Sequence, residues 1–192
     1  MLALSKAIRS GAIPNAEIVL VLSDKADAGG IAAASERGLK TLVVERRGRK
    51  REDHESEIIS VLREYDVELI CLAGYMRLLS PCFIEAFSRR ILNIHPSLLP
   101  SFPGLDAQRQ ALKHGVKWSG CTVHFVDDTL DGGPIIEQRA VPVLDDDSEE
   151  TLSARILEQE HKLYAEAVAR IVNGDFEIVG RRVVHSSAKG TI

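Results

Sequence analysis

The sequence has few cysteines, no long apolar run and no excess of positive charge, and each shortage excludes a class of protein. Cys71, Cys82 and Cys121 are odd in number and lack metal-ligand spacing, which argues against a disulfide framework and a cysteine-bound zinc. They stand in apolar stretches, which predicts reduced, packed thiols in a cytoplasmic protein. With 24 Lys and Arg against 28 Asp and Glu, the net charge is −4, so no global basic field favours nucleic acid or an anionic membrane.

The apolar runs are only as long as strands, so no transmembrane helix is expected. The opening Met-Leu-Ala-Leu-Ser-Lys also lacks the layout of a signal peptide. What is present is an ordinary globular composition, 45% hydrophobic and 27% charged over 192 residues, which suits one domain of medium size. We therefore expect a single cytoplasmic domain over residues 1–192, in which residues 175–192 form a C-terminal extension with a hairpin.

Short apolar runs alternate with amphipathic segments through residues 2–114, as strands and helices do when they follow one another. Strands are expected at 16–22, 40–44, 67–73 and 90–94, and helices at 2–10, 30–37, 53–65, 80–87 and 106–114. The rhythm then changes to strands at 122–126 and 135–143 with only a loop between them. A long helix over 148–172 follows, with Asp147 as its expected N-cap. The pattern predicts a doubly wound α/β fold, with a mostly parallel Rossmann-like sheet and antiparallel additions in the C-terminal part.

Asn93 and His95 come at the end of one predicted strand, and Pro96, Pro100 and Pro103 follow within a few residues. In an open parallel sheet, ligands bind beyond the carboxyl ends of the strands. Pro96 disfavours a helical conformation at His95, so a stiff, extended loop should follow the strand. On spacing alone, the segment is better interpreted as a connector stiffened by prolines than as a loop that holds catalytic side chains.

Four further segments carry polar side chains, and each has an ordinary structural alternative. Residues 127–134 fit a Gly-Gly-Pro turn and match no calcium loop, while residues 74–79 fit a lead-in to a helix. Glu160 falls on the apolar stripe of the long helix, where it either meets a cationic or hydroxyl-bearing ligand or reaches solvent. The basic run 46–51 is expected to be a solvated loop, with contact to a phosphate or to a ligand carboxylate as the second option. The other histidines, at scattered positions, are assigned no chemistry.

Four stretches together carry a family resemblance: LAGYMRLLSP (72–81), LNIHPSLLPSFPGLDAQRQAL (92–112), TVHFVDDTLDGGPII (122–136) and EQEHKLY (158–164). They resemble the phosphoribosylglycinamide formyltransferases, a branch of the folate-dependent formyltransferase family. The resemblance runs from residue 1 to about residue 174, and the order of elements agrees with that family's fold. The pattern Asn-x-His-Pro-Ser-Leu-Leu-Pro followed by Leu-Asp-Gly-Gly-Pro is specific for folate-type formyl-transfer domains.

The resemblance implies an enzyme that transfers the formyl group of 10-formyltetrahydrofolate to the amine of glycinamide ribonucleotide in de novo purine (IMP) biosynthesis. It implies small-molecule partners, no nucleic acid, no membrane, no metal, and a monomer or homodimer. The matching positions imply catalysis by Asn93, His95 and Asp131, formylfolate binding by Arg51, Met76, Arg77, Leu78, Leu79, Asn93, Asp127 and Asp128, and ribonucleotide binding by Leu157, Glu160 and Asp131.

In the implied mechanism, the Asn93 amide and a protonated His95 donate hydrogen bonds to the developing oxyanion, and Asp131 favours the imidazolium. A proton moves from the attacking amine to the folate nitrogen through His95 or a water held by Asp131. Three alternatives stay open: another folate-dependent formyltransferase, a formyltetrahydrofolate hydrolase, and an inactive folate-binding remnant.

The resemblance also implies a difference at the N-terminus. The family begins with a strand and a Gly-x-Gly-Ser-Asn turn whose backbone donors hold the ribonucleotide phosphate. The sequence here opens on a predicted helix, so we expect the first strand and the phosphate loop to be absent. Either the start is misplaced, which we favour, or the shorter chain has a gap in its sheet and compromised phosphate binding.

Overall fold

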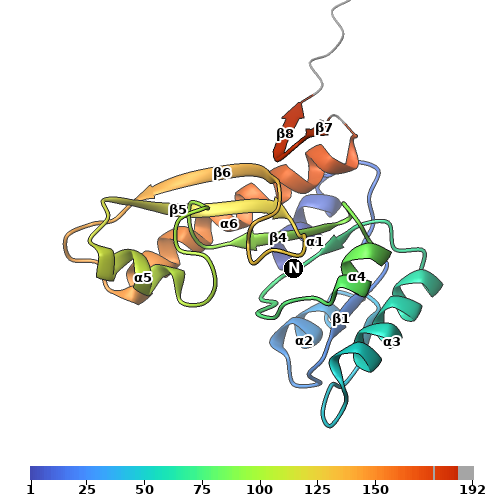
Figure 1. Cartoon of the computed structure of the whole chain (residues 1–192). Helices are drawn as coiled ribbons and strands as arrows, with labels where there is room; N and C mark the ends of the chain where they lie inside the picture. The colour runs from blue at the N-terminus through green and yellow to red at the C-terminus, as the bar shows by residue number, and fades with distance from the viewer. Residues whose placement is uncertain (175, 186–192) are drawn as a thin grey trace, which may run out of the picture.

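A computed structural model describes residues 1–174 and 176–185, and its helices and strands follow one another in the expected order (Figure 1). Residues 186–192 of the expected C-terminal extension, and residue 175, lie outside the described residues. The helices are α1 (Leu2–Arg9), α2 (Gly29–Ser35), α3 (Arg51–Glu64), α4 (Pro81–Ala86), α5 (Ala107–His114) and α6 (Glu149–Val172). The strands are β1 (Val21–Ser23), β2 (Thr41–Val43), β3 (Ile70–Cys71), β4 (Ile91–His95), β5 (Trp118–Phe125), β6 (Ile135–Pro142), β7 (Phe176–Val179) and β8 (Arg182–His185).

The strands form two sheets. β1 and β2 pair in parallel as a two-stranded sheet, and the others form a six-stranded sheet in the order β3-β4-β5-β6-β8-β7. β3 and β4 are parallel, whereas β5 runs antiparallel to both of its neighbours and β7 forms the terminal hairpin with β8. This arrangement confirms the expected α/β fold, with parallel pairs in the N-terminal part and antiparallel additions in the C-terminal part.

β1 and β3 are shorter than the sequence predicts. Of the apolar run 16–22 only its last residues are in strand conformation, and of the run 67–73 only Ile70–Cys71. Continuous apolar runs are typical of parallel strands that are covered on both faces. Here the residues of both strands are only half-buried, and among the described residues β1 pairs with β2 alone and β3 with β4 alone. The described part of the chain places no strand between β1 and β3.

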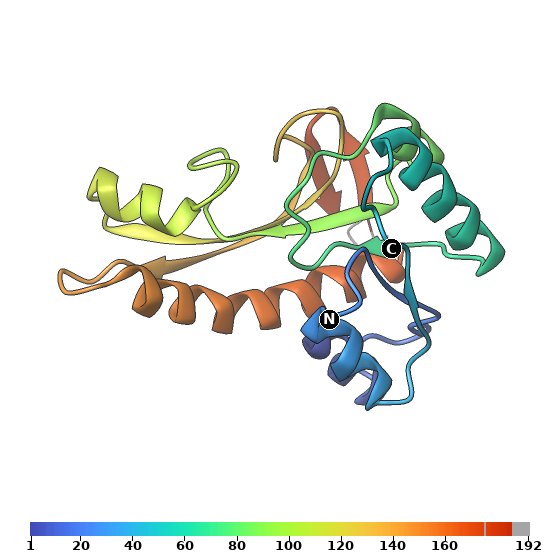
Figure 2. The ribbon, with the colours of Figure 1, turned by 90° about the horizontal axis from the view of Figure 1, so that it is seen from below.

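Two apolar clusters cover opposite faces of the larger sheet. Ile91 and Leu92 are successive residues of β4, and both are fully buried. Ile91 packs in the cluster that includes side chains of α3 and α4, whereas Leu92 packs in the cluster that includes side chains of α1 and α6. Successive side chains of a strand point to opposite faces, so β4 lies in the middle layer of the molecule. Figure 2 shows α6 running along one side of the long strands.

The start of α6 differs from the sequence expectation, because Ser148 rather than Asp147 is the N-cap. The Ser148 hydroxyl accepts from the Thr151 N–H at 3.3 Å, and the Thr151 hydroxyl accepts from the Ser148 N–H at 2.9 Å. Asp147 instead forms a salt bridge of 2.7 Å with Arg155 and accepts from the Leu144 N–H, which closes the turn before the helix. In the part of the chain that the structure describes, no helix, α6 included, is long and apolar enough to cross a membrane.

The expectation of three packed cysteine thiols is correct for two of them. All three thiols are free. Burial raises the pKa of Cys71 to about 11 and that of Cys121 to about 12, so both stay protonated at neutral pH. Cys82 is exposed, because in the short helix α4 it is Phe83 that packs inward.

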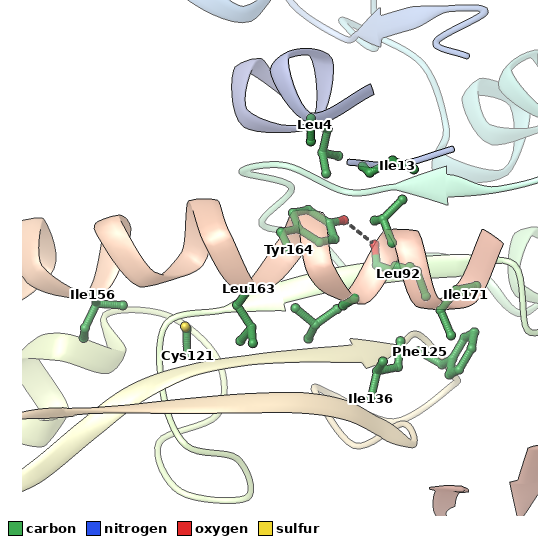
Figure 3. Packing of buried hydrophobic residues seen from close by; sticks show 14 of the residues in the cluster. Leu4, Ile13, Leu92, Cys121, Phe125, Ile136, Ile156, Leu163, Tyr164 and Ile171 are labelled. Carbon is green, nitrogen blue, oxygen red and sulfur yellow. Dashed lines mark hydrogen bonds between the residues drawn. The ribbon is translucent and has the colours of Figure 1, made fainter. Parts of the chain in front are cut away.

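Tyr164 fastens α6 to the sheet. Its side chain is 5% exposed, and its hydroxyl lies 2.9 Å from the Leu72 carbonyl. The hydroxyl also lies 3.1 Å from the Leu92 carbonyl (Figure 3). The hydroxyl therefore binds the backbone just after β3 and within β4. A buried hydroxyl needs such partners, because leaving one unpaired costs about 1–3 kcal/mol.

We expect Tyr164→Phe to lower the free energy of unfolding by about 1–2 kcal/mol, because it removes the hydroxyl and leaves the ring packing in place. Urea denaturation followed by circular dichroism measures this loss. Tyr65→Phe is the matched control, since the Tyr65 hydroxyl forms no hydrogen bond in the described structure. Equal unfolding midpoints for Tyr164→Phe and the unmodified chain would contradict the role given to this hydroxyl.

Candidate functional site

The pairing of β4 with β5 sets the framework of the site. Their antiparallel register places Asn93 opposite His124 and His95 opposite Thr122. Residues two apart on a strand share one face, so both pairs point to the same side of the sheet. His95, His124 and Thr122 are buried, and Asn93 is half-buried. The strand ends at His95, as the sequence predicts.

Both ring nitrogens of His95 face hydrogen-bond acceptors. Nε2 lies 2.9 Å from the Phe102 carbonyl, which can only accept, so this nitrogen carries a proton. Nδ1 lies 3.4 Å from Oδ2 of Asp131, and the same oxygen accepts from the Gly104 N–H at 2.8 Å. An imidazolium would donate to both acceptors, with the Asp131 carboxylate balancing its charge.

Hydrogen bonds hold the loop after β4 in place. The Thr122 hydroxyl donates to the Ser97 carbonyl at 2.7 Å and accepts from the Leu99 N–H at 3.1 Å. The loop then turns back, so that the Phe102 carbonyl reaches His95 and the Gly104 N–H reaches Asp131. This proline-containing stretch therefore supplies two backbone groups to the site.

A glycine allows the loop that carries Asp131 to cross the end of β5. A Cβ atom at Gly133 would lie 1.9 Å from the Phe125 carbonyl oxygen, a distance that no side chain permits. The close approach lets the Phe125 N–H donate to the Pro134 carbonyl at 2.9 Å. Asp131 itself has φ of 48°, in the left-handed region that aspartate tolerates better than most residues. The turn chemistry of this loop is thus what delivers the carboxylate to His95.

His124, to which the sequence assigned no chemistry, is part of the cluster. Its Nδ1 lies 2.8 Å from the Phe125 carbonyl and must carry a proton, so Nε2 holds a lone pair. Nε2 lies 3.3 Å from Nδ2 of Asn93, which therefore donates to it. Burial lowers the pKa of His124, and this favours the neutral ring that the contact with Asn93 requires. The sequence did hold one signal for His124: apolar and polar side chains alternate along the predicted strand 122–126. Without the register of strand pairing, this alternation does not show which residue His124 contacts.

The predicted folate residues divide into three environments. Arg51, Arg77 and Leu78 line one cavity of about 270 Å³. Leu79 is buried in the apolar cluster with α3 and α4. Met76 is 76% exposed. Asn93, His95 and Asp131 do not line this cavity.

The remaining predicted residues lie on the acidic loop and on α6. Asp127 accepts from the Thr129 N–H at 2.9 Å, which shapes the loop before Asp131, and Asp128 is exposed. Leu157 is exposed, whereas Glu160 is half-buried and burial raises the pKa of its carboxyl. Within the described residues, no group of three or more His, Cys, Asp or Glu is placed to hold a metal ion.

Comparison with known proteins adds to this geometry. A family model described as formyl transferase matches residues 1–168. The chain belongs to the formyl transferase family. Its fold agrees with that of a family member, glycinamide ribonucleotide transformylase 1 from Symbiobacterium toebii, with a TM-score of 0.94 and 48% identity over 96% of this chain and 87% of that one.

Curated relatives of the family differ in length. Phosphoribosylglycinamide formyltransferase of Escherichia coli (strain K12) is 44% identical over 155 residues, which are 80% of this chain and 73% of that protein. The trifunctional purine biosynthetic protein adenosine-3 of Drosophila melanogaster is 47% identical over 161 residues. That match spans 83% of this chain but only 12% of the trifunctional protein.

The lowered pKa of His124 gives a prediction for stability. The unfolded chain takes up a proton at this histidine near the ordinary pKa of 6.5, while the folded chain resists it. The free energy of unfolding should therefore fall as the pH drops below that value, and His124→Gln should weaken this fall. Chemical denaturation at about pH 7.5 and about pH 5.5 tests it. His161→Gln, at an exposed position of α6, is the control, and an unchanged pH dependence in His124→Gln would contradict the assignment.

Proposed function

We propose that this chain transfers the formyl group of 10-formyltetrahydrofolate to the amine of glycinamide ribonucleotide, in the cytoplasm, as a step of de novo purine biosynthesis. It would act on these small molecules as a monomer or homodimer. The observation that carries the proposal is the cluster of Asn93, His95 and Asp131, which combines an oriented amide donor, a proton carrier and a carboxylate. These are the groups that formyl transfer to an amine needs. The names of the relatives favour this reaction over hydrolysis of the formylfolate.

The residues present fit a formylfolate. Arg51 and Arg77 supply cations for its carboxylates, and Tyr75 and Leu78 supply aromatic and apolar surface in the same cavity. When bound, the folate provides an activated formyl group. The half-buried Glu160 on α6 would accept from hydroxyl or amine groups of the ribonucleotide.

Asn93 is suited to stabilise the negative charge that develops on the formyl oxygen. One N–H of its amide is held by His124, which fixes the amide plane and leaves the second N–H available. A donor that is already oriented needs no rearrangement during the reaction, and removing such a donor typically lowers the rate by about 10²–10³.

His95 and Asp131 are suited to move the proton. The attacking amine must lose a proton and the departing folate nitrogen must gain one. In this structure, His95 Nε2 donates to the Phe102 carbonyl and Nδ1 faces the carboxylate of Asp131. To donate a proton to the folate nitrogen, Nε2 must exchange the Phe102 carbonyl for the reacting atoms, while Asp131 compensates the charge of the ring. Burial of both side chains excludes water that would otherwise screen this pair.

We expect Asn93→Ala and His95→Ala each to lower kcat by at least about 10², because each removes a donor to the reacting oxygen. A spectrophotometric assay with 10-formyltetrahydrofolate, with and without glycinamide ribonucleotide, measures the change. Asn173→Ala, at the far end of α6, is the control for loss of an amide. Turnover near that of the unmodified chain in either variant would overturn the proposal, and formate release without the ribonucleotide would indicate a hydrolase instead.

We also expect Asp131→Asn to move the acidic limb of the pH–rate profile. The carboxylate of Asp131 can balance the charge of a protonated His95 ring, whereas an amide at position 131 cannot. Measuring kcat across the pH range for both proteins tests this. An acidic limb at the same pH in both would remove Asp131 from the proton-carrying role.

A further inference from the structure

The loop that carries Asp131 contains a segment whose backbone has unusual freedom. Asp131 has φ of 48° and is followed by Gly132 and Gly133, and glycine restricts the backbone less than any other residue does. The carboxylate must nevertheless stay close to His95 Nδ1, 3.4 Å away, and to the Gly104 N–H, 2.8 Å away. A group that restrains the backbone next to Asp131 would therefore act on the geometry of the His95–Asp131 pair.

Hydrogen bonds inside this loop restrain mainly its first half. The Asp127 carboxylate accepts from both the N–H and the hydroxyl of Thr129. The Gly132 N–H reaches the Thr129 carbonyl only at 3.4 Å. In the described structure, no group of the loop itself donates to the Gly132 carbonyl. The orientation of the peptide between Gly132 and Gly133 thus depends on a donor from outside the loop.

Arg181, in the turn of the β7–β8 hairpin, supplies that donor. Its Nη2 donates to the Gly132 carbonyl. The turn consists of Gly180 and Arg181, and Gly180 has φ of 62°, which lets the chain reverse within two residues. In the part of the chain that the structure describes, Arg181 makes no ion pair, so no carboxylate competes with the carbonyl for its guanidinium.

The hairpin is packed against both ends of the same loop. Phe176 of β7 contacts Phe125, the residue that ends β5, with ring centroids 5.7 Å apart. Arg182 of β8 pairs with Ile135, the residue that begins β6. β8 lies next to β6 in the larger sheet (Figure 1). Because the hairpin contacts residues on either side of the loop, it presents Arg181 from a position that is fixed relative to that loop.

We propose that Arg181 is a positioning residue for formyl transfer, which acts through the Gly132 carbonyl to hold Asp131 beside His95. The inference rests on the proposed function, because it assigns a task in that reaction to a residue outside its site. A guanidinium suits the task, since it is always charged and a charged donor bonds a carbonyl more strongly than a neutral one does. Arg181 makes no hydrogen bond or ion pair with the three proposed catalytic side chains in the described structure, so its effect is indirect.

The alternative role for an exposed arginine beside a site is contact with an anionic group of a substrate. Arg181 does not line the cavity assigned to the formylfolate, and the bond that it makes is to the backbone of the loop. The two roles differ in kinetics. Loss of a ligand contact raises KM, whereas loss of a positioning residue lowers kcat, because the reacting groups are then less often in the productive arrangement.

Steady-state kinetics of Arg181→Gln, with each substrate varied in turn, test the proposal. We expect kcat to fall by about three- to tenfold, the size that loss of one exposed hydrogen bond gives, and each KM to stay within about twofold. Arg181→Lys, which keeps a charged donor, should recover part of the loss. Arg182→Gln, at the neighbouring exposed position, is the control and should match the unmodified chain. An unchanged kcat in Arg181→Gln, or a rise in KM alone, would overturn the proposal.

A double-mutant cycle shows whether Arg181 acts through Asp131. In an Asp131→Asn background, Arg181→Gln should lower the single-turnover rate, measured with enzyme in excess, by less than about twofold, because the carboxylate that it positions is already gone. An equal fold-loss in the two backgrounds would mean that Arg181 acts independently of Asp131, and the assignment would fail.

Hydrogen exchange of the backbone amides requires no turnover and so separates this proposal from the proposed function. In Arg181→Gln, the amides of residues 127–133 should exchange faster than in the unmodified chain, while those of β4 should keep their rates. If the unmodified chain transferred no formyl group, faster exchange in this loop would still support the restraint by Arg181, and the proposed function alone would fail. Equal exchange rates in both chains would contradict the restraint.

Discussion

The antiparallel pairing of β4 with β5 is the constraint on which the site depends. Parallel strands would bring their carboxyl ends to one edge of the sheet, but they would not place Asn93 opposite His124 and His95 opposite Thr122. Because the register is fixed by burial on both faces of β4, a slip of β4 by one residue would move Asn93 and His95 to the wrong side of the sheet. The positions of the amide donor and the proton carrier are thus consequences of core packing around Ile91 and Leu92.

Backbone groups of two loops complete the site that the pairing of β4 with β5 forms. The loop after β4 is held by Thr122 and returns a carbonyl and an N–H to His95 and Asp131. The loop after β5 brings Asp131 to the same place because Gly133 has no side chain to strike Phe125. Two turns held by hydrogen bonds and close packing therefore bring together His95 and Asp131, which belong to distant parts of the chain.

Much of this could be predicted from the sequence, and the failures have physical causes. Strand alternation and the following prolines placed Asn93 and His95 at the end of a strand, but on spacing alone they favoured a plain connector. The assignment of both residues to a site came from the family resemblance. The same holds for Asp131, since nothing local shows which strand end its loop will cover. His124 was missed because its role depends on register, which hydrophobic pattern does not specify. The strands over 16–22 and 67–73 were predicted too long because their apolar runs fit strands with two neighbours. The N-cap of α6 was placed one residue early because Asp147 and Ser148 both suit that position, and Asp147 is bound by Arg155 instead.

The separation of β1 and β2 from the larger sheet has a mechanical consequence. In the described residues, no strand pairing joins the two sheets, which are held together by apolar side chains and by the ion pair of Arg77 with Asp24. Such a unit can open locally at a lower free energy than the rest, and its backbone amides should exchange hydrogen faster than those of β4 and β5. Arg46 follows β2 and Arg77 follows β3, and both line the same cavity. A ligand that contacts both residues would therefore connect the smaller sheet to the larger one. Binding of a ligand there and the stability of the N-terminal layer would then be thermodynamically linked.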